Sequence, residues 1–279
     1  MITNTPAAMR HRSPWWELTA FAAASYAILW GVAAAIAVLG IAVTGTGSAW
    51  ALAGIWAPTL AGVLLTALFD GPSGLRELVG RALSWRVGTR WFAVPLLLVP
   101  ALVLAFPVAG ALADGHTVPL PTAAGWLTIT VLAAVQGPLG EEFGWRGFAL
   151  PRLLERMAPF WASVLLGIVW GVWHLPGFWL GVPPYDTYPF GGLVLGCVGM
   201  SLLMTWVHRG TGGSLLLAGL LMHAGMNAAH AYVGEYGLQI HLVPGALLLV
   251  AVGLAVVVRG PSWWFGRPRP VPTVIGREV

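Results

Sequence analysis

Three short stretches of the chain combine carboxylate, imidazole and amide side chains at helical spacing. They read GEEFGWR (140–146), WGVWH (170–174) and HAGMN (223–227). A carboxylate beside an imidazole can take a proton from water, and an imidazole and an amide on one helix face can donate hydrogen bonds to a developing oxyanion. Together these groups suit the attack of water on the carbonyl of an amide bond.

The spacing within the stretches predicts which side chains act together. Glu142 and Arg146 are four residues apart, so on a helix they share a face and can pair. Glu141 points about 100° away from Glu142, which leaves its carboxylate for a different partner. His223 and Asn227 are also four residues apart and face the same way.

The same atoms could instead hold a metal ion. One carboxylate and two imidazoles, here Glu141, His174 and His223, form a known catalytic zinc set that leaves a position open for water. No HExxH helix is present, and these ligands come from three separate segments. The lone Cys197 excludes a cysteine-based metal site and any intramolecular disulfide. From the residues alone, a metal-free site and a zinc site both remain open.

The elements that carry these residues are predicted to be membrane helices. The chain has 279 residues, of which 58% are hydrophobic and only 9% charged, and its mean hydropathy is +0.80. Soluble domains are about 25% charged, so a soluble enzyme and a disordered protein are both excluded. We predict an all-α, polytopic membrane protein with about eight transmembrane helices. The apolar segments lie at about 15–43, 50–69, 91–113, 125–150, 160–180, 190–207, 213–233 and 242–258.

The placement of basic residues predicts the orientation. All 14 basic residues are Arg, and each falls on one side of the membrane if the N-terminus lies in the cytoplasm. We therefore expect cytoplasmic N- and C-termini and Arg contacts with lipid headgroups, rather than a nucleic-acid partner. The predicted organisation is a cytoplasmic segment at 1–14, one membrane domain at 15–258 and a cytoplasmic tail at 259–279 that we expect to be disordered. Residues 75–83 predict a short amphipathic helix on the cytoplasmic surface.

Helix lengths predict that the three polar stretches meet. If the fourth helix runs through Pro151 to a hairpin tip near 157–158, Glu141 and His174 lie at one level, roughly 25 Å from the tip at 1.5 Å per residue. His223 reaches a similar depth from the cytoplasmic end of its own segment. A network that only holds helices together is the alternative, but apolar residues pack helices without the cost of burying several ionisable groups. We therefore favour a functional site.

The ordered motifs resemble those of the CPBP family, which includes the CAAX proteases and the bacteriocin-processing enzymes. The family pattern is EExxxR, then FxxxH, then Hxxx(N/D), on three membrane helices. Here the three stretches match it in order and spacing, within a motif core at about 125–233. The departure is Trp170, where the family pattern often has Phe, and we expect the same packing role for it beneath His174.

The resemblance implies an intramembrane endopeptidase with its active site facing the cytoplasm. Glu141 would activate water with the help of His174, and His223 and Asn227 would stabilise the oxyanion. By this resemblance we expect a glutamate mechanism without a cofactor, with zinc on the carboxylate and the two imidazoles as the alternative. The supporting residues would be Glu142, Arg146 and Trp170.

The expected partners are the lipid bilayer and a membrane-associated peptide or protein substrate. The Arg-only, Ala- and Gly-rich composition suggests a bacterial chain in the plasma (inner) membrane, where prenylated CAAX substrates are not expected. Two other functions compete. An immunity or peptide-binding membrane protein would bind a partner without cutting it, and a secondary transporter would use Glu141 or His174 as a proton site. No internal repeat supports the transporter.

Overall fold

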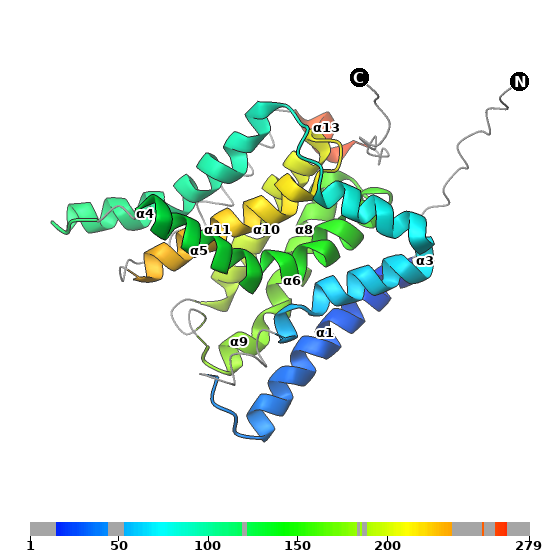
Figure 1. Cartoon of the computed structure of the whole chain (residues 1–279), viewed down its shortest axis with the longest axis horizontal. Helices are drawn as coiled ribbons and strands as arrows, with labels where there is room; N and C mark the ends of the chain where they lie inside the picture. The colour runs from blue at the N-terminus through cyan, green and yellow to red at the C-terminus, as the bar shows by residue number, and fades with distance from the viewer. Residues whose placement is uncertain are drawn as a thin grey trace, which may run out of the picture.

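The computed structural model describes residues 15–43, 53–118, 122–182, 185, 189–235, 253 and 260–266, whose arrangement Figure 1 shows. Within these ranges every regular element is a helix and none is a strand, which confirms the all-α prediction. The α-helices are α1 (Trp15–Val38), α3 (Ala57–Ala82), α4 (Val99–Ala113), α5 (Ala123–Gln136), α6 (Pro138–Glu142), α7 (Leu150–Leu154), α8 (Pro159–Trp173), α9 (Leu175–Trp179), α10 (Phe190–Gly210), α11 (Met222–Glu235) and α13 (Pro261–Phe265). A 3-10 helix, η1 (Thr89–Phe92), and three π-helices, η2 (Val94–Leu98), η3 (Phe143–Ala149) and η4 (Leu216–Leu221), complete the set.

Five stretches among the described residues are helical, long and apolar enough to cross a membrane. They coincide with five of the eight predicted segments. The eighth segment, at 242–258, lies outside the described residues except for Gly253. The predicted N-terminal segment at 1–14 also lies outside them. The chain is therefore a membrane protein with at least these candidate spans. They are Trp15–Val38, Ala53–Ala82, Thr89–Ala113, Pro159–Trp179 and Phe190–Gly210.

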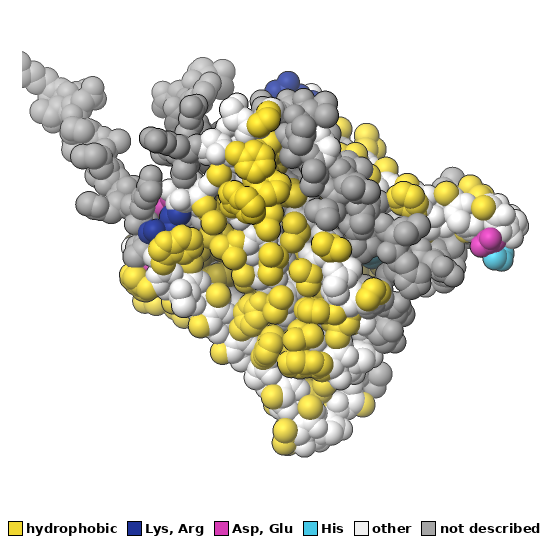
Figure 2. Space-filling view, turned by 180° about the vertical axis from the view of Figure 1, so that it is seen from behind, with side chains coloured by type: hydrophobic (Ala, Val, Ile, Leu, Met, Phe, Trp, Pro, Cys, Tyr) yellow, Lys and Arg dark blue, Asp and Glu magenta, His cyan; other side chains and the backbone are white. Residues whose placement is uncertain are grey.

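The outer surface of these helices is apolar. On α3, Leu60, Leu64 and Leu68 lie four residues apart on one face, and their exposed fractions are 55%, 59% and 66%. Figure 2 shows hydrophobic side chains spread over the rear face of the molecule, with the visible charged side chains toward its margins. Exposed apolar area of this extent fits contact with lipid rather than with water.

The predicted fourth helix, at 125–150, is divided by a break at Gly137. Its φ and ψ angles are −148° and −73°, and α6 begins at Pro138. The cause is local, because Pro138 has no backbone N–H to continue α5 and disfavours the helical conformation in the residue before it. Beyond the break, α6, η3 and α7 follow one another through Pro151, and α8 begins at Pro159. The hairpin was therefore predicted correctly, and the uninterrupted helix was not.

The predicted amphipathic helix forms the second half of α3. The two halves meet at Gly71, whose φ of +64° lies in the left-handed region that favours glycine, and Pro72 follows it. Of the apolar residues in the predicted pattern, Leu78 and Ala82 are buried, whereas Val79 and Leu83 are exposed. The Arg81 side chain donates a hydrogen bond to the backbone carbonyl of Gly147, so this half of α3 is fixed to the π-helix η3.

A buried cation ties the hairpin to the first two long helices. Arg152 of α7 pairs with Glu17 of α1, Nε to Oε2 at 2.8 Å, and with Asp70 of α3, its terminal NH2 nitrogen to Oδ2 at 2.6 Å. Its guanidinium carbon also lies 3.7 Å from the ring centroid of Phe148. These contacts join residues far apart in sequence and hold α1 and α3 against the elements that carry the first motif.

The first part of the predicted tail is helical rather than disordered. In α13, the ring of Phe265 lies 4.8 Å from that of Phe160 at the start of α8. A terminal guanidinium nitrogen of Arg209, in α10, donates to the carbonyl oxygen of Trp263 across 2.9 Å. Aromatic and polar contacts thus dock this segment, while residues 267–279 lie outside the described part.

Candidate active site

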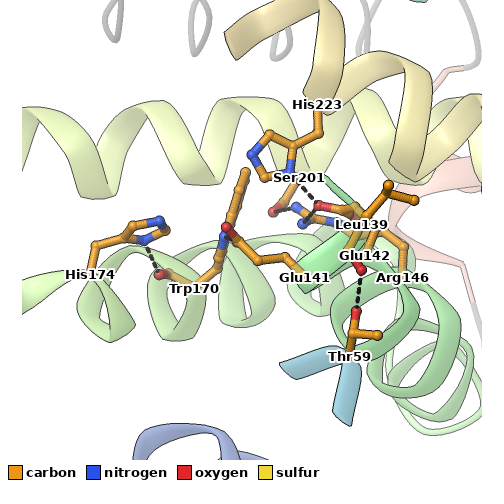
Figure 3. Close-up of polar contacts among 9 residues, drawn as sticks. All are labelled: Thr59, Leu139, Glu141, Glu142, Arg146, Trp170, His174, Ser201 and His223. Carbon is orange, nitrogen blue, oxygen red and sulfur yellow. Dashed lines mark hydrogen bonds and ion pairs between the residues drawn. The ribbon is translucent and has the colours of Figure 1, made fainter. Parts of the chain in front are cut away.

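Glu141 points into the protein from α6 and meets Trp170 of α8. Its side chain is only 3% exposed, and its Oε2 accepts a hydrogen bond of 2.6 Å from the indole Nε1 of Trp170 (Figure 3). The carboxylate is therefore turned toward the interior of the helical bundle and away from lipid. The Trp170 ring, at 1% exposed, is itself fully enclosed.

His174 stands at the end of α8, one helical turn beyond Trp170. Its Nδ1 lies 2.8 Å from the backbone carbonyl oxygen of Trp170. Because a carbonyl oxygen only accepts, Nδ1 carries the hydrogen, and in the neutral imidazole Nε2 then carries the lone pair. The ring also rests edge-on against Trp173, with centroids 4.9 Å apart. His174 is thus oriented with one nitrogen engaged by the backbone and the other left for chemistry.

Helix α1 fixes the end of α8 that presents His174. The hydroxyl of Tyr26 donates to the carbonyl of Val169 across 2.6 Å, and the indole of Trp30 donates to the carbonyl of Trp173 across 3.2 Å. Helix ends leave carbonyls without intrahelical partners, and Pro176 prevents α8 from continuing regularly. Two side chains from α1 therefore bind backbone carbonyls of the last part of α8, where it gives way to α9.

Glu142 pairs with both Arg146 and His223 through one oxygen. Its Oε1 accepts from the terminal NH1 nitrogen of Arg146 at 2.9 Å and from Nδ1 of His223 at 2.8 Å. Glu142 and Arg146 are 0% exposed and His223 is 3% exposed. The pairing predicted from the four-residue spacing is present, and His223 joins it from α11. With Nδ1 engaged, Nε2 is the nitrogen that His223 offers to a ligand.

His223 and Asn227 are directed at a common point beside Gly137. A Cβ placed on Gly137 would lie 2.7 Å from Nδ2 of Asn227 and 3.2 Å from Nε2 of His223. The two nitrogens therefore converge at the junction of α5 and α6, four residues before Glu141. Sequence reasoning missed Gly137, although its position before Pro138 marked a break in the helix that carries the first motif.

Trp170 connects the two halves of the site. Its indole donates to Glu141, and the guanidinium carbon of Arg146 lies 4.1 Å from its ring centroid. The imidazole of His223 packs against it at 5.2 Å and that of His174 at 6.0 Å between centroids. The packing expected beneath His174 is present, and it is joined by a hydrogen bond that packing alone did not predict. The three motifs thus meet around one indole.

The described residues contain no group of three or more His, Cys, Asp or Glu side chains arranged to hold a metal ion. Glu141 uses Oε2 for Trp170, and His223 uses Nδ1 for Glu142. These contacts leave Oε1 of Glu141 and Nε2 of His223 for another ligand.

Comparison with known families matches residues 123–229 to the type II CAAX prenyl endopeptidase Rce1-like model. The matched region contains all three motifs. A curated relative, CAAX prenyl protease 2 of Methanococcus maripaludis, is 25% identical over 223 residues, which are 73% of this chain and 79% of the relative. Both matches support the CPBP family, to which the motifs pointed, and a peptidase.

Proposed function

We propose that this chain, a peptidase of the CPBP family, is an intramembrane endopeptidase that uses a glutamate-activated water molecule. One observation is the main support for this proposal. Glu141 and His174 both form hydrogen bonds with Trp170, one with its indole and the other with its backbone carbonyl, so an acid and an imidazole from different helices contact the same residue (Figure 3).

In the proposed reaction, Glu141 takes a proton from water while Nε2 of His174 accepts a hydrogen bond from the same water. The oxygen of the water bonds to the carbonyl carbon of the substrate. The carbonyl oxygen becomes an oxyanion, which receives hydrogen bonds from Nε2 of His223 and Nδ2 of Asn227. When the carbon–nitrogen bond breaks, Glu141 returns the proton to the leaving nitrogen, and a carboxylic acid and an amine result. The acid then loses its remaining proton to solvent.

The buried pair behind His223 supports the role of an oxyanion donor. A donor at Nε2 with Nδ1 already protonated requires the charged imidazolium, and Glu142 lies 2.8 Å from Nδ1 to balance that charge. Arg146 in turn holds the carboxylate in place at 2.9 Å. The arrangement supplies a fixed, positively charged donor where negative charge develops in the transition state.

The proposal includes a metal-independent mechanism. It is supported by the hydrogen bonds that orient Glu141 and His223, from Trp170 to Oε2 and from Nδ1 to Glu142, because they leave Oε1 and Nε2 for water and substrate. Purified protein assayed for zinc and then treated with a chelator tests this directly. One tightly bound zinc per chain, together with a loss of cleavage that zinc restores, would replace this mechanism with a metal-dependent one.

We further propose the setting of the reaction: a plasma-membrane protein with cytoplasmic termini, a site that opens to the cytoplasm and a bacterial origin. The substrate is a membrane-associated peptide or protein. The relative is named as a CAAX prenyl protease. The first probe of cleavage is therefore a quenched fluorogenic peptide that ends in a farnesylated CAAX sequence. The same peptide without the prenyl group is its control.

Comparative membrane peptidomics of wild type against Glu141→Ala tests catalysis and identifies a substrate together. We expect peptides that accumulate in the wild type and are absent from Glu141→Ala and from His174→Ala. His116→Ala, at an exposed position, serves as the control and keeps the wild-type pattern. Full proteolysis in either site variant would contradict the assigned roles, and a phenotype that survives Glu141→Ala would favour a peptide-binding or immunity protein.

A further inference from the structure

We propose that Ser201 is a positioning residue for His223, acting through Arg146 and Glu142. Ser201 lies on α10, which carries none of the three sequence motifs. The inference rests on the proposed function, because the group that Ser201 orients is the proposed oxyanion donor. Ser201 adds α10 to a site whose three sequence motifs lie on other helices.

The contact itself is short and fully buried. Ser201 is 1% exposed, and its Oγ accepts a hydrogen bond of 2.9 Å from the terminal NH2 nitrogen of Arg146. The other terminal nitrogen, NH1, donates to Oε1 of Glu142 at 2.9 Å. Because Arg146 is 0% exposed, bulk water does not reach its guanidinium to replace either partner.

The geometry of a guanidinium links the two contacts. Its nitrogens form a rigid planar fork, so anchoring one terminal nitrogen fixes the direction of the other. The ring of Trp170 covers one face of this plane, with the guanidinium carbon 4.1 Å from the centroid, and so restricts movement out of the plane. Ser201 restricts rotation within the plane. The two together fix where Arg146 holds Glu142.

The carboxylate then transmits this position to the imidazole. The same oxygen of Glu142, Oε1, accepts from both Arg146 and Nδ1 of His223. A rotation of the guanidinium therefore moves the acceptor that sets the imidazole plane, and with it the direction of Nε2. Loss of the Ser201 hydroxyl leaves a buried charged donor without its acceptor and releases this constraint.

The chain offers a matched control for an ordinary buried hydrogen bond. Ser163 of α8 and Thr205 of α10 join their hydroxyls at 2.7 Å, and both side chains are 0% exposed. Thr205 lies four residues beyond Ser201 on the same helix. Removing the hydroxyl of Ser163 costs a buried contact between α8 and α10 without touching Arg146, so it reports the effect of a structural role alone.

The test measures cleavage of the quenched farnesylated CAAX peptide by full-length protein in detergent micelles. For Ser201→Ala we expect kcat to fall by about tenfold or more with KM changed by less than about twofold, since the lost interaction acts on the transition state. Ser201→Thr keeps the hydroxyl and recovers most of kcat. Ser201→Cys keeps the size but offers a weak acceptor, and stays low. We expect Ser163→Ala to lower the thermal midpoint as much as Ser201→Ala does, but to keep wild-type kcat.

A second measurement is independent of cleavage. In protein labelled with 15N-histidine, the Nδ1–H signal of His223 is assigned by its absence in His223→Gln. It shifts or broadens in Ser201→Ala and is unchanged in Ser163→Ala. An unaltered His223 signal, or equal loss of kcat in the two alanine variants, would overturn the proposal. If wild type leaves the probe uncut, the proposed function fails for that substrate, and the His223 signal still decides the role of Ser201.

Discussion

Trp170 donates its indole hydrogen to Oε2 of Glu141 across 2.6 Å, from α8 to α6. A Phe, which the CPBP pattern often has at this place, supplies a smaller aromatic ring and has no such donor. The backbone carbonyl of the same Trp170 receives Nδ1 of His174 at 2.8 Å. One residue therefore orients both groups that are proposed to handle the proton of the attacking water.

Replacing Trp170 by Phe separates the hydrogen bond from the packing. A smaller aromatic ring remains against Arg146 and His223, while Glu141 loses its donor. We expect kcat to fall by about tenfold or more, as loss of a hydrogen bond to a charged group costs about 1.5–3 kcal/mol, with little change in KM. Steady-state cleavage of the quenched CAAX peptide measures this.

Trp264→Phe provides the control for this substitution. Trp264 is 2% exposed in α13, and its indole nitrogen has no hydrogen-bond partner within the described part of the chain. It should keep wild-type kcat. If Trp170→Phe is equally active, the hydrogen bond to Glu141 has no part in catalysis, and the interpretation of Trp170 as packing alone is sufficient.

The part of the site that follows from local geometry was predictable. The four-residue spacing of Glu142 and Arg146 predicts their ion pair, and the structure has it at 2.9 Å. The start of α8 at Pro159 follows from the fixed φ of proline at a helix N-terminus. Helix lengths also predict that Glu141 and His174 lie near each other, because rise per residue depends little on sequence, and both side chains contact Trp170.

The contacts that depend on breaks and on distant packing were not predictable. An ideal helix gives the angle between Glu141 and Glu142, but the break at Gly137 and the π-helix η3 decide which carboxylate meets which partner. The bond from Ser201 to Arg146 spans 55 positions of sequence. A serine in an apolar run gives no sign of such a partner, since a structural small residue looks the same.

The buried pair of Glu142 and Arg146 predicts strong non-additivity in stability. Both side chains are 0% exposed, so Glu142→Gln leaves the guanidinium without its counter-charge and should cost about 3–5 kcal/mol of unfolding free energy. Arg146→Met removes the same pair from the other side. The double variant should lose less unfolding free energy than the two single variants lose together, and the difference should exceed about 1 kcal/mol.

Unfolding by SDS titration in mixed micelles, followed by circular dichroism, measures these three variants against wild type. A cycle built on Ser163→Ala and Glu142→Gln is the comparison, because those side chains share no contact and their effects should add. Additive losses for Glu142 and Arg146 would show that their contact contributes little to folding.

Gly137→Ala tests whether the space beside His223 and Asn227 is needed. The new Cβ would stand 2.7 Å from Nδ2 of Asn227, closer than such contacts allow, so the amide must move from its place. We expect at least a tenfold loss of kcat, roughly the size seen when an oxyanion donor is impaired. Gly234→Ala, on the same helix as His223 and with open space around it, should retain activity. Wild-type kcat in Gly137→Ala would place the reacting carbonyl elsewhere.

The proposed orientation predicts opposite labelling of two threonines that flank one span. Thr89 begins the stretch from Thr89 to Ala113, and Thr117 lies just beyond its other end, and both are exposed. Arg86 and Arg90 place the Thr89 end in the cytoplasm by the positive-inside rule, since no Arg lies near Thr117. In a Cys197→Ala background, we expect a membrane-impermeant maleimide to label Thr117→Cys on intact cells and Thr89→Cys only after permeabilisation. The reverse result would put the termini outside and would contradict a site that opens to the cytoplasm.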